Sequence, residues 1–111
     1  MVAEADMTEL RSLCPDAKQA QEGGLRYVLL PSLKLPDGCM PAELDCLLCV
    51  DPRDCYAGRL FFSQVVGTRE PRNWHMQSVR ILERNWSAFS WQIPANLRPM
   101  EILLTLLRAL R

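Results

Sequence analysis

His75 and Ser78 are the residues of this chain whose types and spacing best suit nucleophilic chemistry. A serine hydroxyl is a weak nucleophile that needs a general base. His75 is the only histidine, and an unperturbed imidazole titrates near neutral pH. Residues three apart share a face in a helical turn but point to opposite faces in a strand. The two residues are therefore expected to act together only if residues 75–78 are helical; otherwise His75 is structural and Ser78 an ordinary polar residue.

Four cysteines, Cys39, Cys46, Cys49 and Cys55, offer a second kind of chemistry, because four thiolates can hold a zinc ion. The spacing of Cys46 and Cys49 is typical of a zinc site. Two leucines lie between them in an apolar strand, however, where residues three apart face opposite sides. The pattern therefore favours free thiols without a metal, with Cys46 in the core and Cys55 exposed in a turn. A small zinc-binding interaction domain stays as an alternative.

A few elements must position these residues. The pattern predicts a short helix over residues 3–13 and three strands over 25–30, 43–50 and 58–66. The polar stretch 17–24 ends in two glycines and is interpreted as a loop. Three successive strands followed by a final helix predict an α+β fold, an antiparallel meander packed against helices.

The end of the chain is predicted to be an apolar helix, with Asn96 as its cap and Pro99 in its first turn. Apolar residues cover most of its circumference, so the sheet or a partner must cover it. Its narrow polar stripe consists of Glu101, Thr105, Arg108 and Arg111. The residues predicted to form the core are Leu25, Tyr27, Leu48, Leu60, Phe62, Ile81, Trp86 and Leu103.

Several short motifs follow one another along the chain in a particular order. They are LPDG at 35–38, ELDCLLCV at 43–50, GRLFFS at 58–63, and Asn73-Trp74-His75 followed by Trp86-Ser87. This order resembles that of ubiquitin-conjugating (E2) enzymes. It is closer still to the small bacterial E2-like group found beside genes for ubiquitin-like, E1-like and JAB-peptidase proteins. The resemblance covers roughly residues 25–111, and the motifs are more specific together than singly.

The resemblance implies a single domain over residues 1–111, with an N-terminal helix and polar loop in 1–22 and a core in 25–111. It implies an E2/UBC-like (RWD-like) fold that takes the C-terminal tail of a ubiquitin-like protein from an E1-like adenylating enzyme. Trp74, Trp86 and Ser87 are expected to contact that tail.

The first helix, with Glu9 and Arg11, is expected to meet the E1-like partner, and a JAB-type peptidase is a further partner. No cofactor is expected, because the chain has no glycine-rich phosphate loop and adenylation would belong to the E1-like protein.

The chain departs from the E2 pattern at its centre. Counting back from Trp86 places the catalytic cysteine of E2 enzymes at Ser78, and no cysteine follows Cys55. The His-Pro-Asn motif expected near residues 68–70 is absent, as is the proline after Trp86-Ser87. A thioester at position 78 is therefore excluded. Ser78 carries an oxyester, or the domain is a non-catalytic adaptor that scaffolds its partners, or Ser78 is an engineered replacement of a cysteine.

Composition limits the binding partners and the cellular compartment expected for the protein. The 13 basic and 13 acidic residues balance, so no electrostatic footprint for nucleic acid or anionic lipid is visible. No apolar run reaches the roughly 18 residues of a membrane span. The acidic N-terminus lacks the pattern of a signal peptide, and the five cysteines are an odd number. We expect a cytoplasmic protein with reduced thiols that binds neither nucleic acid nor membrane.

Overall fold

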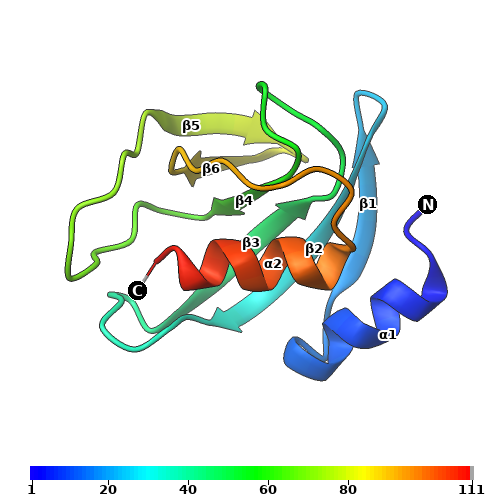
Figure 1. The fold of residues 1–111 in the computed structure, drawn as a ribbon, viewed down its shortest axis with the longest axis horizontal. Helices are drawn as coiled ribbons and strands as arrows, with labels where there is room; N and C mark the ends of the chain where they lie inside the picture. The colour runs from blue at the N-terminus through cyan, green and yellow to red at the C-terminus, as the bar shows by residue number, and fades with distance from the viewer. Residues whose placement is uncertain (111) are drawn as a thin grey trace.

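Six antiparallel strands and two helices form the fold, which a computed structural model describes for residues 1–110 (Figure 1). The elements are α1 (Glu4–Leu13), β1 (Lys18–Glu22), β2 (Leu25–Lys34), β3 (Glu43–Cys49), β4 (Arg59–Phe62), β5 (Met76–Ile81), β6 (Arg84–Ala88) and α2 (Pro99–Arg108). The strand order is β1-β2-β3-β4-β6-β5. The predicted α+β class, with an antiparallel sheet and an apolar C-terminal helix, is confirmed. Arg111 of the predicted polar stripe lies outside the described residues.

The three strands predicted from apolar runs are present as β2, β3 and β4. β2 is longer than predicted and continues through Pro31, with a shift of register between Leu30 and Leu33. β4 is shorter than predicted, and all four of its residues are buried. The predicted core is confirmed except at Leu25, which is only partly buried because it lies beside the hairpin turn at the start of β2.

The prediction of a loop over residues 17–24 was wrong, because most of this stretch forms β1. Gly23 and Gly24 both have positive φ and join β1 to β2 by a two-residue turn. The strand is polar because it lies at the edge of the sheet, where neither face is fully covered. An edge strand of this kind lacks the apolar run by which strands are predicted.

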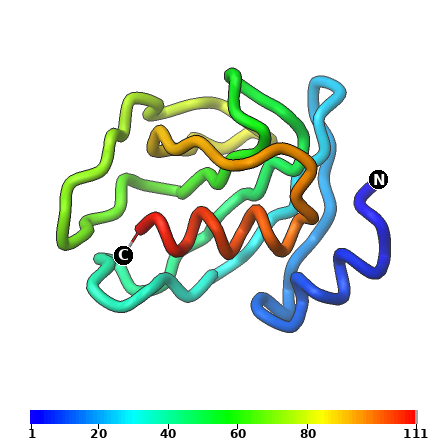
Figure 2. Tube along the Cα trace, viewed as in Figure 1, coloured from blue at the N-terminus to red at the C-terminus, as the bar shows by residue number. Residues whose placement is uncertain are grey.

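A second hairpin, β5–β6, was not predicted as a pair of strands. Its two-residue turn consists of Leu82 and Glu83, both with positive φ, although such turns favour asparagine and glycine. The hairpin joins the sheet through Phe62 of β4, which pairs with Ser87 of β6. The trace in Figure 2 shows the long connection over residues 63–75 that leads from β4 to this hairpin.

The sheet buries apolar residues on both faces. One face carries the larger core, to which Leu10 of α1 and Leu103 of α2 contribute. The other face carries a smaller cluster built around Trp86, Tyr27 and Phe61. Because the buried residues of both helices belong to the larger core, the smaller cluster is enclosed by the curl of the sheet.

The C-terminal helix lies across the strands and meets α1 at its N-terminal end (Figure 1). Its N-cap is Arg98 rather than the predicted Asn96, which has a φ of 64° and belongs to the preceding turn. The backbone N–H of Arg98 donates to Glu101 at 2.8 Å, and its guanidinium lies 3.1 Å from Glu9 of α1. Pro99 occupies the first turn, as predicted. Within residues 1–110 no helix is long and apolar enough to cross a membrane.

Candidate functional site

Ser78 lies in a β-bulge of β5, at the outer edge of the sheet. Gln77 and Ser78 together face Ser87 of β6, where a regular ladder would place one residue. Ser78 is exposed and has a φ of 57°, in the left-handed region that few non-glycine residues adopt. Bulges re-aim side chains and occur often beside functional sites, so the sequence-predicted position is locally distinctive.

His75 and Ser78 lie in a non-helical segment, the case in which the two side chains were not expected to act together. His75 directly precedes β5, and Met76–Ile81 is a strand, so the helical turn that would put the two side chains on one face is absent. Both residues are exposed, and no hydrogen bond between described residues joins them. The structure therefore gives the Ser78 hydroxyl no base in hydrogen-bonding contact.

The three residues expected to contact a ubiquitin-like tail lie in different environments. Trp86 is 1% exposed, as predicted for a core residue, and its Nε1–H donates to the carbonyl of Ile81 at 3.0 Å. Ser87 is 7% exposed. Trp74 is half-buried on the opposite face and packs edge-on against Phe62. The three do not form one exposed surface, and Trp74 offers the largest accessible part.

A pocket of about 380 Å³ opens beside His75. It lies between the 53–56 turn, the start of β4 and the start of β5. Its lining residues are Asp54, Tyr56, Arg59, His75, Met76, Gln77 and Ser90. His75 and Gln77 flank the first residue of β5, whereas Ser78 is not part of the lining.

Arg59 is the buried charge of this pocket, with a side chain only 5% exposed. Its Nη1 donates to Oδ2 of Asp54 at 3.2 Å, and its Nη2 donates to the carbonyl of Phe89 at 3.3 Å. Its guanidinium lies 4.4 Å from the ring centroid of Tyr56. Sequence reasoning missed Arg59, although an arginine that opens an otherwise apolar strand is a signal that could have identified it.

The cysteines are arranged as the alternation of β3 predicts. Cys46 and Cys49 are both fully buried but belong to the clusters on opposite faces of the sheet, so they cannot share a metal. Burial raises the pKa of the Cys39, Cys46 and Cys49 thiols. Cys55 is exposed in a turn, as predicted. Among residues 1–110 no three His, Cys, Asp or Glu side chains gather as a metal site would require.

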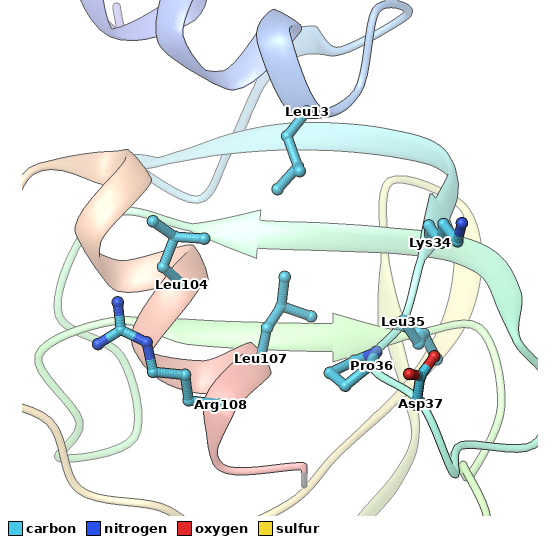
Figure 3. A pocket seen from close by; sticks show the side chains of 8 residues that line it. All are labelled: Leu13, Lys34, Leu35, Pro36, Asp37, Leu104, Leu107 and Arg108. Carbon is cyan, nitrogen blue, oxygen red and sulfur yellow. The ribbon is translucent and has the colours of Figure 1, made fainter.

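A separate groove of about 510 Å³ lies between the end of α1, the end of β2 and the helix α2 (Figure 3). Leu13 points from α1 toward Leu104 and Leu107 of α2. Leu13 is 42% exposed, which is high for a leucine at the end of a packed helix. Lys34, Asp37 and Arg108 place charges around this apolar floor, so the groove suits an apolar side chain of a partner. Its remaining lining residues are Leu35 and Pro36.

Comparisons of the chain with protein-family models, with curated proteins and with solved structures found no match.

Proposed function

We propose that this chain is an E2-like component of a bacterial ubiquitin-like conjugation pathway. In this role it receives or positions the C-terminal tail of a ubiquitin-like protein that an E1-like enzyme delivers. The observation that supports the proposal most is the order of elements: α1, then the meander β1–β4 and, after the β5–β6 hairpin, an apolar helix packed on the same sheet. An E2/UBC-like (RWD-like) fold would share the first helix, the meander and the later apolar helix. The motifs at 35–38, 43–50 and 58–63 support the same family.

Positioning of the tail without a covalent bond is the version that the geometry favours. Among residues 1–110 no base is hydrogen-bonded to Ser78, and β5 lies at the outer edge of the sheet. An edge strand presents unpaired backbone N–H and C=O groups that can hydrogen-bond to an extended chain. A flexible tail would therefore run along β5 past Ser78, with the exposed part of Trp74 near one end.

An oxyester on Ser78 is the second version, and one observation favours it. The residue is exposed at a bulge with left-handed backbone, and strain of this kind gathers at functional sites. The base would be His75 after a local change of backbone, or a group from the E1-like partner. In ester formation the Ser78 oxygen would attack the acyl adenylate of the tail, which the E1-like enzyme makes from ATP. The acyl–phosphate bond would break with release of AMP, and the hydroxyl proton would pass to that base.

The covalent version is tested by mixing the protein with its E1-like partner, the ubiquitin-like protein and ATP, followed by intact-mass spectrometry. An oxyester would survive brief reduction, be cleaved by hydroxylamine and be absent from Ser78→Ala. If His75 is the base, His75→Ala would slow its formation by roughly 10²- to 10⁴-fold. A reducible adduct would instead map to Cys55, the exposed thiol of residues 1–110, and Cys55→Ser would remove it.

The binding version is tested in the same mixture by measuring affinity for each partner separately. Binding of both partners without any adduct would support positioning. Absence of both adduct and binding would contradict the proposed function as a whole. Ser78→Cys adds a control, because a thiol is the better nucleophile and would capture a correctly placed acyl group as a reducible thioester.

The surface expected to meet the E1-like partner is the exposed side of α1 together with the groove of Figure 3. Leu13→Asp would place a charge in that groove and is expected to weaken E1-like binding about tenfold or more, while leaving the ubiquitin-like partner unaffected. Val65→Asp is the matched control, since Val65 is 40% exposed against 42% for Leu13 but lies outside the groove. Equal effects of the two variants would contradict this assignment. A JAB-type peptidase is proposed as a further partner without an assigned surface.

A further inference from the structure

Two arginines share a single carboxylate at the wall of the pocket beside His75. Oδ2 of Asp54 lies 3.2 Å from Nη1 of Arg59 and 3.2 Å from Nε of Arg53. Nε of Arg53 is buried and, despite this distance, is not oriented to donate a hydrogen bond. Tyr27 accepts a hydrogen bond from Arg53 but carries no charge in its phenolic form. The group of two arginines and one aspartate therefore holds one positive charge in excess.

The excess positive charge lies on side chains that are largely shielded from water, where an unneutralised charge raises the free energy of the folded state. The Arg59 side chain is 5% exposed and that of Arg53 is 25% exposed, so water screens them incompletely. A buried charge without a counterion destabilises a protein unless a partner neutralises it. The carboxylate of Asp54 already forms ion pairs with both arginines, so it presents little net negative charge to an incoming anion.

The pocket offers room and donors for such an anion. Its volume of about 380 Å³ exceeds what one carboxylate fills. Arg59, His75, Gln77 and Ser90 supply polar groups around it, and Met76 supplies an apolar wall. This combination suits a carboxylate attached to a short, largely uncharged body.

We propose that this pocket binds the free C-terminal carboxylate of an extended peptide, with Arg59 as the principal anion-binding residue. β5 provides part of the pocket wall through Met76 and Gln77, and it is an edge strand. A peptide paired along that edge would bring its terminus to Arg59. The inference requires no E1-like enzyme or ATP, and therefore holds or fails independently of the conjugation pathway.

A carboxylate is favoured over phosphate by its charge. One carboxylate neutralises the single excess positive charge of the arginine–aspartate group. A phosphate dianion would carry one negative charge more than the arginine–aspartate group can neutralise, and would leave the pocket with a net negative charge. Free inorganic phosphate is therefore expected to bind more weakly than a peptide carboxylate.

The test is an NMR chemical-shift titration of the full-length protein with acetylated tetraglycine. We expect the peptide with a free carboxylate to shift the signals of His75 and Gln77 and of the Arg59 side chain. The same peptide with a C-terminal amide is expected to bind about 10- to 100-fold more weakly, because it loses a charge-assisted interaction. Equal binding of acid and amide, no binding of the acid, or tighter binding of inorganic phosphate would each overturn the proposal.

Substitutions of pocket residues test whether the peptide carboxylate binds beside Arg59. Arg59→Gln is expected to weaken binding of the acid about 10- to 100-fold, with its fold checked by circular dichroism. Because Arg59 is buried and this variant can fail to fold, Gln77→Glu provides a second variant at an exposed position. It places a carboxylate in the pocket and should weaken binding to a similar extent. The matched control is Gln64→Glu, an exposed position outside the pocket. Unchanged binding in Gln77→Glu, or equal losses in Gln77→Glu and Gln64→Glu, would overturn the assignment.

Discussion

At the scale of single residues, Cys55 differs from the other cysteines in its access to reagents. It is exposed, whereas Cys14, Cys39, Cys46 and Cys49 are buried. A thiol-specific chromogenic reagent such as Ellman's reagent should therefore titrate one thiol rapidly in the native protein, and the remainder only after denaturation. Cys55→Ser should remove the rapid phase. Two or more rapidly reacting thiols in folded wild-type protein would contradict the burial described above.

Asp51 and Arg26 form an ion pair that should make stability depend on pH. The Asp51 carboxylate accepts hydrogen bonds from the backbone N–H of Arg26 and from its Nη2, both at 2.7 Å. The hydrogen bonds from the Arg26 side chain hold the pKa of Asp51 below its usual value. Because the folded pKa lies below the unfolded one, this stabilisation is present above the unfolded pKa and is lost as pH falls through the folded pKa.

Replacement of Asp51 tests this pair. Asp51→Asn is expected to lower the free energy of unfolding by about 1–2 kcal/mol at pH 7, since it removes a charge-assisted interaction that is partly exposed to water. The deficit should shrink as pH falls through the folded pKa of Asp51. Urea denaturation of wild type and variant over pH 7 to 2 measures both values, and Asp37→Asn, at an exposed position, is the control. A deficit that stays constant with pH would contradict the role of the charge.

Residue roles that depend on local pattern could be predicted, and those that depend on distant contacts could not. Cys46 and Trp86 were placed in the core from their apolar surroundings, and both are buried. The pocket of Arg59 depends on contacts with Asp54 and with the carbonyl of Phe89, 30 positions away. No spacing rule links those residues, so the pocket beside His75 could be found only from the structure.

At the scale of elements, the turn of the β5–β6 hairpin is strained. Leu82 and Glu83 adopt left-handed backbone, which costs roughly 1–2 kcal/mol for a residue with a side chain. Glu83 is exposed, so Glu83→Gly should relieve strain without loss of packing and raise the free energy of unfolding by about 0.5–1 kcal/mol. Urea denaturation measures the change.

A second glycine variant controls for the general effect of glycine. Glu43 is also exposed, lies at the start of β3 and has no positive φ. Glu43→Gly should therefore lower the free energy of unfolding, because it adds backbone freedom to the unfolded chain. Changes of the same sign in Glu83→Gly and Glu43→Gly would show that strain in the turn is not relieved.

The strands divide by their chemistry into those that sequence could predict and those that it could not. β2, β3 and β4 are central and mostly buried, so their apolar runs were visible. β1 and β5 are the two edges of the sheet. β1 carries mainly polar residues, and half of the residues of β5 are polar and exposed. The β5–β6 turn also lacks the asparagine or glycine that marks a hairpin. Half of the sheet thus follows from pairing partners rather than from local pattern.

At the scale of the whole molecule, the buried side of α1 is part of the main core, although its exposed side is the proposed partner surface. Met7 and Leu10 have no exposed area and lie in the same cluster as Leu103 of α2. Removal of residues 1–16 should therefore unfold the protein rather than only remove a binding surface. Leu10→Ala should lower the free energy of unfolding by about 2–5 kcal/mol.

Circular dichroism and urea denaturation check both changes. Thr8→Ala is the control, because Thr8 is exposed on the same helix and should change stability by no more than about 0.5 kcal/mol. A native-like spectrum after removal of residues 1–16 would contradict the place of α1 in the core.

The short pairing between β4 and β6 should affect local opening of the sheet on the scale of seconds to hours. One pair of residues, Phe62 and Ser87, aligns β4 with β6, whereas longer ladders join β2 to β1 and to β3. A region held by fewer backbone pairs opens at lower free energy than the rest of the molecule. Backbone amides of β5 and β6 should therefore exchange with deuterium earlier than those of β2 and β3. Because β5 forms one wall of the Arg59 pocket, a peptide bound there should slow exchange in β5.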